Sequence, residues 1–228
     1  METKLLSDHA EDLLEAAELL RNGAVVGMPT ETVYGLAADA RNPEAVRQIF
    51  AAKGRPADNP LIVHIAEMRA LEQVAATVPP LAEKLAERFW PGPLTMILPK
   101  RKEIPEITSG GLDTVGIRMP SHPVARALIQ LSGVPIAAPS ANISGYPSPT
   151  TAQHVMRDMQ GKIAAVVDGG ACSVGVESTV IALEPNGTVR ILRPGFVTKE
   201  MLEEVAPEVT LDPAILHQLQ EGQTVRSP

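Results

Sequence analysis

The sequence predicts a protein of the α/β class. Short apolar runs recur along its 228 residues and are bounded by turn residues, as buried strands are. They alternate with stretches in which apolar side chains return at helical spacing, and proline and glycine fall between the segments. With 44% hydrophobic residues the chain can bury a sizeable core, as one domain or as one domain with a small appendage.

The composition argues against several classes of protein. The net charge of −7, from 27 acidic and 20 basic residues, gives no general attraction for nucleic acid. The single cysteine, Cys172, rules out an internal disulfide framework, and the five histidines show no metal-ligand spacing. No apolar run reaches the roughly 20 residues of a membrane span, and the acidic first residues are unlike a signal peptide. We therefore expect a cytoplasmic protein with no membrane partner and no protein-built metal site.

The first predicted elements are a helix and a strand. Residues 10–22 carry apolar side chains at helical spacing, and Asp8 with Glu11 can form a capping box at their start. An apolar strand at 24–28 leads into the segment P-T-E-T-V-Y-G-L at 29–36, where hydroxyls and a carboxylate lie among apolar residues. Buried polar groups need partners, so this segment either supports a polar network or lines a ligand site.

A second helix is predicted over residues 43–53, because Asn42 can cap it and Gly54 can end it. The apolar run at 61–65 is short and bounded, like a buried strand. The last residue of the helix and Arg55 on the following loop are cations that these two elements can hold rigidly.

The remaining elements follow the same punctuation. Proline or threonine opens several of the helices and glycine follows several strands and helices. Helices are predicted at 71–74, 81–89, 123–133, from 151 onward and at 199–205, and strands at 94–98, 114–118, 135–138, 164–168, 178–183 and 189–192. After the last helix, capped by Thr198, we expect a polar tail.

The polar residues that follow these strands predict an anion site. Ligands of open α/β sheets bind outside the carboxyl ends of the strands. The cations gathered there are Lys53, Arg55, Arg118 and Arg193, and the neutral hydrogen-bonding groups are Thr32, Ser140, Asn142 and Ser178. Several cations in an acidic protein indicate a multiply charged small ligand. The usual nucleotide motifs and the G-x-S-x-G elbow do not occur, so the residues alone predict an anion-binding α/β protein that could be an enzyme.

A set of longer motifs carries a family resemblance. They are P-T-E-T-V-Y-G-L at 29–36, K-G-R-P-A-D-N-P-L at 53–61, F-W-P-G-P-L-T at 89–95, I-R-M-P at 117–120, P-S-A-N-I-S-G at 139–145, E-S-T-V at 177–180 and R-P-G at 193–195. In this order, across about residues 7–200, they closely resemble the YrdC-like family of L-threonylcarbamoyladenylate synthases. The resemblance implies a twisted mixed α/β sheet, flanked by helices around a deep cleft. It also implies an enzyme that joins L-threonine, bicarbonate and ATP with release of diphosphate, toward N6-threonylcarbamoyladenosine at position 37 of tRNA.

The same resemblance implies roles for single residues. Lys53, Arg55, Ser140 and Asn142 match the family's catalytic set around the ATP phosphates. Asn59, Ser148 and Arg193 resemble further ATP contacts, and Thr32, His64, Arg118 and Ser178 match the threonine pocket. Mg²⁺ would be held mainly by the ATP phosphates, which requires few protein ligands.

Two further inferences concern partners and extent. The product would pass to the tRNA threonylcarbamoyl-transferase machinery, and a weak contact with tRNA stays open. Long family members continue through a linker into a second domain, so we expect a catalytic domain at 1–200 and, at 201–228, a polar tail resembling the start of that linker. Short members end soon after the R-P-G segment, so the resemblance leaves open whether the chain is a truncated two-domain form.

Two other functions fit the sequence less well. One is a double-stranded RNA or tRNA-binding module, for which clustered positive charge is missing. The other is a carbamoyl-transfer relative of hydrogenase maturation proteins, which carry zinc-finger segments that one cysteine cannot supply.

The two cations at 53 and 55 also give an expectation about stability. If both face a triphosphate, replacing either should change the free energy of unfolding by no more than about 0.5 kcal/mol. Activity should fall by about 100-fold or more, because a charge-stabilising donor is lost.

Overall fold

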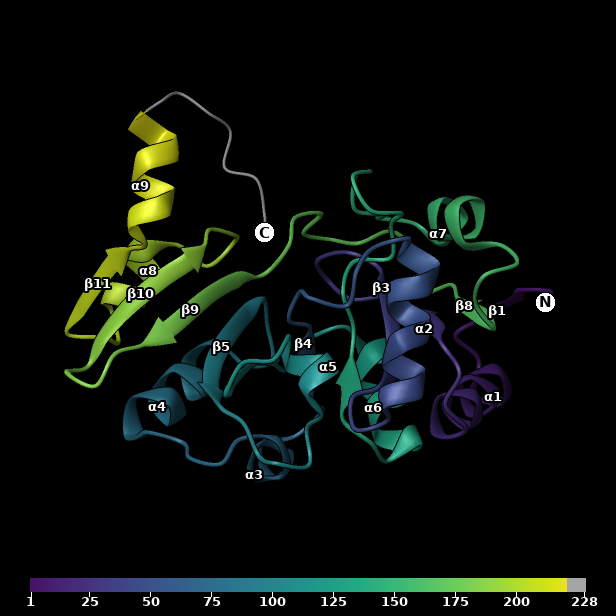
Figure 1. The fold of residues 1–228 in the computed structure, drawn as a ribbon, viewed down its shortest axis with the longest axis horizontal. Coiled ribbons are helices and arrows are strands. Elements are labelled where there is room, and N and C mark those ends of the chain that lie inside the picture. Colours follow the sequence, from purple (N-terminus) through teal and green to yellow (C-terminus); the bar gives the residue numbers. More distant parts are fainter. Residues whose placement is uncertain (221–228) are drawn as a thin grey trace.

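Eleven strands form one mixed sheet in the computed structural model, which describes residues 1–220, the last three by backbone alone. The strands are β1 (Lys4–Leu6), β2 (Val26–Met28), β3 (Gly35–Asp39), β4 (Ile62–His64), β5 (Leu94–Pro99), β6 (Thr114–Arg118), β7 (Ile136–Ala137), β8 (Ala165–Val167), β9 (Thr179–Leu183), β10 (Thr188–Arg193) and β11 (Glu208–Leu211). Their order is β1-β8-β2-β3-β7-β4-β6-β5-β9-β10-β11, and the sheet twists along its length (Figure 1). The predicted α/β class and mixed sheet are confirmed.

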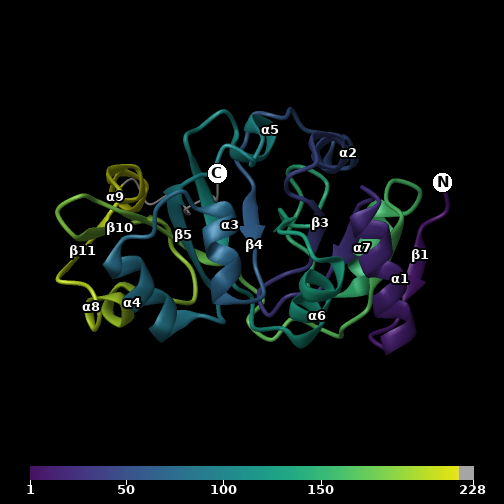
Figure 2. The same ribbon diagram turned by 90° about the horizontal axis from the view of Figure 1, so that it is seen from below.

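Helices flank the sheet. They are α1 (Ala10–Arg21), α2 (Pro43–Lys53), α3 (Leu71–Val74), α4 (Pro80–Phe89), α5 (Glu106–Ser109), α6 (Pro123–Ser132), α7 (Ala152–Met159), α8 (Lys199–Glu203) and α9 (Pro213–Gln220), with a 3₁₀ turn at Met68–Ala70. Seen from below, α1 and α6 lie on one side of the sheet and α2 and α5 on the other (Figure 2). Two buried clusters hold these layers, one containing Leu20 and Leu128 and the other containing Val46 and Ile49.

The predicted capping of α2 is confirmed. The Asn42 Oδ1 accepts from the backbone N–H groups of Glu44 and Ala45 at 3.1 and 3.4 Å, and Gly54 ends the helix with φ = 68°. This left-handed backbone conformation favours glycine at the end of a helix. The start of α2 and the loop after it are therefore fixed by local chemistry.

The predicted capping box at the start of α1 is wrong. The cap residue is His9, which makes no side-chain cap bond. Asp12 instead accepts from the backbone N–H and the hydroxyl of Ser7 at 2.7 and 2.8 Å. Because the helix begins after residue 9, a carboxylate in its first turn reaches back to the preceding loop.

Residues 208–220 differ from the expected polar tail. Strand β11 pairs in parallel with β10, joining Val189 to Val209, and α9 follows it. The sheet therefore extends beyond the expected boundary at residue 200. The rest of the expected tail, 221–228, lies outside the described residues, and its interpretation as a linker stays a prediction. Within residues 1–220, no helix has the length and apolar character that a membrane span requires.

Candidate active site

Two neighbouring cavities collect most of the predicted site residues. The first, of about 100 Å³, is lined by Thr32, Arg55, His64, Arg118, Ser140, Ser178 and Arg193 among the predicted residues. The second, of about 360 Å³, is lined by Ser148 and Arg193. Val33, Glu177 and Arg193 line both, so the two cavities share a wall.

Arg118 lies at the end of β6 and is 3% exposed. Its Nε donates to the Gly92 carbonyl at 3.3 Å, its Nη1 donates to the Thr32 hydroxyl at 3.0 Å, and its Nη2 forms an ion pair with Glu31. Burial lowers the pKa of Arg118, while Glu31 opposes that shift. Each Nη keeps a second N–H. The guanidinium is thus held by three partners and keeps two N–H groups that these contacts do not use.

Glu31 fixes this arginine in turn. Its second carboxylate oxygen accepts from the backbone N–H and the hydroxyl of Ser121 at 2.9 and 2.8 Å. Its carbonyl accepts from the Val174 N–H at 2.8 Å. One buried residue therefore joins three segments around the first cavity.

His64 supplies a neutral polar group beside Arg118. It ends β4 and is buried, which lowers its pKa to about 3, and the charge of Arg118 adds to the effect. Its Nδ1 lies 3.2 Å from the carbonyl of Ile62. At neutral pH the imidazole is uncharged and can make hydrogen bonds without adding charge to the cavity.

A chain of hydrogen bonds holds Ser178 and Arg193. The hydroxyls of Ser178 and Thr95 are 2.8 Å apart. Arg193 donates from Nε to the Ser178 carbonyl at 3.0 Å and from Nη2 to the Ser178 hydroxyl at 3.1 Å. Its Nη1 lies 3.1 Å from Glu177, whose other oxygen accepts from the Ser148 hydroxyl at 3.0 Å. Burial lowers the pKa of Arg193, and Glu177 opposes that shift.

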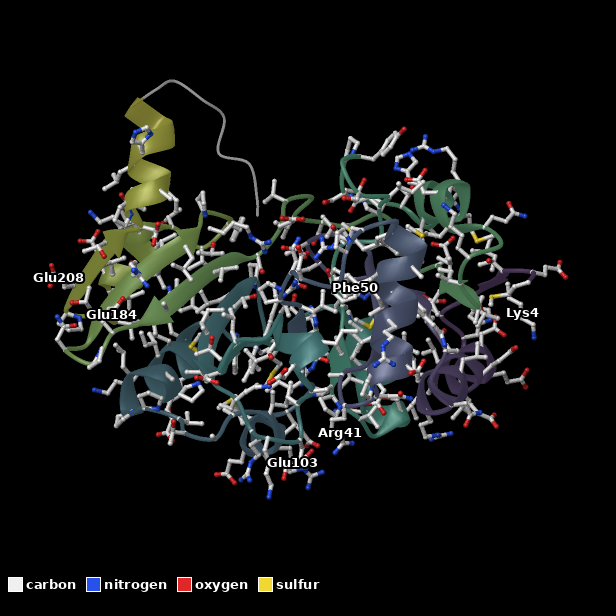
Figure 3. The ribbon with its side chains drawn as sticks, in the orientation of Figure 1. Lys4, Arg41, Phe50, Glu103, Glu184 and Glu208 are labelled. Carbon is white, nitrogen blue, oxygen red and sulfur yellow. The ribbon has the colours of Figure 1, made fainter. Side chains whose placement is uncertain are left out.

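Arg55 reaches the first cavity from the loop after α2. Its guanidinium carbon lies 5.4 Å from the ring centre of Phe50, which Figure 3 labels on α2. Burial lowers the pKa of Arg55. The Phe50 ring supports the guanidinium by a cation–π contact. Arg55 takes part in none of the ion pairs found within residues 1–220.

Lys53 takes a different place from the one expected for a phosphate contact. Its side chain is 1% exposed, and its Nζ donates to the carbonyls of Ser140 and Asn142, the latter at 2.9 Å. The Asn142 side chain donates to the carbonyl of Tyr146 at 2.8 Å. Lys53 and Asn142 therefore hold the loop that carries Ser140. The expectation that replacing Lys53 barely changes stability assumed a side chain facing a triphosphate. In the structure the ammonium is buried and satisfies two carbonyls, so we now expect a larger loss of stability.

Asn59 is separate from these groups. Its side chain is exposed, and it does not line either cavity. Among residues 1–220, no group of three or more histidine, cysteine, aspartate or glutamate side chains is placed to hold a metal ion.

Two polar residues of the site were not identified from sequence. Glu31 lies in the segment whose polar groups indicated either a network or a ligand site, and the structure shows that it belongs to a network lining the cavity. Glu177 precedes Ser178 in a motif, but neither spacing nor composition indicated that its carboxylate would contact Ser148 and Arg193 beside the second cavity.

The buried lysine gives a pH dependence. Burial, helped by the nearby Arg55, lowers the pKa of Lys53 from 10.5 to about 8. Between these two values the unfolded chain holds a proton that the folded protein has released, so this group makes stability rise with pH. The stability advantage of wild type over Lys53→Met should therefore grow from about pH 8 to 10.5 in urea titrations. A constant difference would contradict the lowered pKa.

Comparisons with known proteins identify the family. The family model Sua5_yciO_yrdC, described as telomere recombination, matches residues 18–195. This chain belongs to the Sua5/YciO/YrdC family. Two relatives in the family are named threonylcarbamoyl-AMP synthase. The one from Pyrococcus abyssi is 56% identical over 88% of this chain and 58% of its own length, and the one from Bacillus subtilis is 52% identical over 95% and 62%.

A solved structure of the family agrees with this fold. The crystal structure of P. abyssi Sua5 complexed with L-threonine superposes with a TM-score of 0.90 at 49% identity, covering 100% of this chain and 66% of that one. This chain thus spans 58–66% of the length of these matched family members.

Proposed function

We propose that this chain catalyses formation of L-threonylcarbamoyladenylate from L-threonine, bicarbonate and ATP, with release of diphosphate. The observation that carries the proposal is the first cavity, where a buried arginine, a neutral histidine and three hydroxyl side chains meet. Support comes from relatives at 52–56% identity that bear the name of this activity and from a relative whose structure contains L-threonine.

Threonine fits the first cavity by its chemistry. The two remaining N–H groups of Arg118 match the two oxygens of a carboxylate. Thr32 and Ser178 bring hydroxyls, and His64 brings a neutral ring that can bond to a hydroxyl or an amine. The Glu31 carboxylate keeps Arg118 from being an isolated buried charge before threonine arrives.

ATP fits across the two cavities, since the groups that suit it line one or the other and Arg193 lines both. Arg55 and Arg193 supply charge for the triphosphate, and Ser140 and Ser148 supply hydroxyls. Lys53 and Asn142 support this site by fixing the loop of Ser140. Asn59 would contribute as a further ATP contact from its exposed loop.

The reaction requires the protein mainly to position the substrates and to stabilise charge. The threonine amine takes up CO₂ from bicarbonate to give a carbamate, with loss of water. A carbamate oxygen then bonds to the α-phosphorus while the bond to diphosphate breaks. Arginines near the leaving group stabilise its growing charge, so a protein nucleophile is not required.

Magnesium fits this site as an ion carried on ATP. Such an ion needs one or two carboxylates at most. Among residues 1–220, Glu177 is the carboxylate that lines both cavities. When bound, magnesium would neutralise charge on the diphosphate leaving group. Delivery of the product to tRNA-modifying enzymes, weak tRNA contact and a cytoplasmic location stay predictions.

Diphosphate release tests the proposal directly. With L-threonine, bicarbonate and MgATP the protein should release diphosphate and form a threonylcarbamoyl adenylate detectable by mass spectrometry. Omitting any one substrate should stop release, and L-valine should not replace L-threonine because it leaves the cavity's hydroxyls unpaired. Diphosphate release that does not depend on L-threonine, or no release at all, would overturn the assignment.

A further inference from the structure

Glu177 occupies the donors that the proposed function assigns to ATP. Its two oxygens face the Ser148 hydroxyl at 3.0 Å and the Arg193 Nη1 at 3.1 Å. The side chain is 26% exposed and lines both cavities, so it stands at their shared wall. A triphosphate that approaches Ser148 and Arg193 therefore meets a carboxylate already bound there.

Two arrangements could follow when a nucleotide binds. Without a cation, the carboxylate and the phosphates repel each other, and Arg193 is shared between them. With a divalent cation between them, the same oxygens become joint ligands. Mg²⁺ favours this combination of one carboxylate with phosphate oxygens and water.

The surroundings of Glu177 favour the second arrangement. Arg193 is anchored to Ser178 through its Nε and Nη2, so it keeps its position when Nη1 changes partner. Glu31, the other carboxylate near the first cavity, is buried and bound by Arg118 and Ser121. Glu177 is thus the accessible carboxylate of this site among the described residues.

We propose that Glu177 is the protein ligand for the Mg²⁺ carried by ATP, and that it exchanges Arg193 for this ion when MgATP binds. This inference rests on the proposed function, because it requires ATP in these cavities. Arg193 then turns its Nη1 from Glu177 to a phosphate oxygen. The exchange makes the site selective for the metal-bound nucleotide over metal-free ATP.

Calorimetry with and without magnesium tests the exchange. Wild-type protein should bind MgATP at least about tenfold more tightly than ATP in EDTA. In Glu177→Gln this preference should nearly vanish, because metal-free ATP gains affinity and MgATP loses it. A merely structural role would weaken both forms alike. Electron paramagnetic resonance of MnATP should show the same change in the ion's surroundings.

A matched variant and two outcomes complete the test. Glu184, labelled in Figure 3 at the far end of β9, pairs with Arg190, and Glu184→Gln should leave both affinities unchanged. An unaltered preference for MgATP in Glu177→Gln, or equal weakening of both forms, would overturn the metal role. Wild-type protein that binds neither form would overturn the proposed function as well.

Discussion

Lys53→Met should lower the free energy of unfolding by about 2 to 5 kcal/mol, because two buried carbonyls lose their shared donor. Methionine keeps the length of the apolar stem and lacks only the terminal nitrogen, so the packing of the stem changes little. Diphosphate release should fall by about 100-fold or more, since the loop that carries Ser140 shifts relative to the substrates. Denaturant titration and the diphosphate assay measure the two effects.

The control is an exposed lysine on another helix. Lys84 lies on α4, and Lys84→Met should change stability by no more than about 0.5 kcal/mol. If Lys53→Met proved as stable as Lys84→Met, the carbonyls of Ser140 and Asn142 would have to find other donors. The assigned support of the loop would then be wrong.

Arg118→Met should have the second large effect. It leaves the Glu31 carboxylate buried without its cation, which should cost about 3 to 5 kcal/mol of stability. It also removes the donors proposed for the threonine carboxylate, so L-threonine affinity should fall by about 100-fold or more. Calorimetry with L-threonine and denaturant titration separate these losses.

A double variant distinguishes the structural loss from the functional one. Adding Glu31→Gln to Arg118→Met removes the stranded charge and keeps an acceptor for Ser121, so most of the stability should return. Threonine binding should not return. A double variant that binds L-threonine normally would show that Arg118 is not the partner of its carboxylate.

Local patterns predicted those parts of the fold whose causes are local. The cap at Asn42 and the stop at Gly54 fixed α2, and both are confirmed. Strand β3 was missed because its sequence, G-L-A-A-D, lacks the β-branched and aromatic residues that are typical of strands. Strand β11 was missed because it lies at the edge of the sheet, where only Val209 is buried and the apolar signal is weak.

The site illustrates the same limit. Lys53 continues the apolar stripe of Val46, Ile49 and Phe50, so its burial was encoded in the spacing of α2. The spacing could not show that the loop at 140–142 would arrive opposite it, because the hydrogen bonds span 87 and 89 residues of sequence. The same holds for Glu177, whose partners come from Ser148 and Arg193.

The strand order has a consequence for synthesis on the ribosome. β1 and β2 are not neighbours, because β8 lies between them and pairs in parallel with both. At a translation rate of about 5 to 20 residues per second, β8 emerges roughly 8 to 32 s after β1. Throughout this interval the nascent chain exposes strand edges that only a late segment can cover. Chaperones that shield unpaired edges would therefore meet this protein before its amino-terminal strands find their partner.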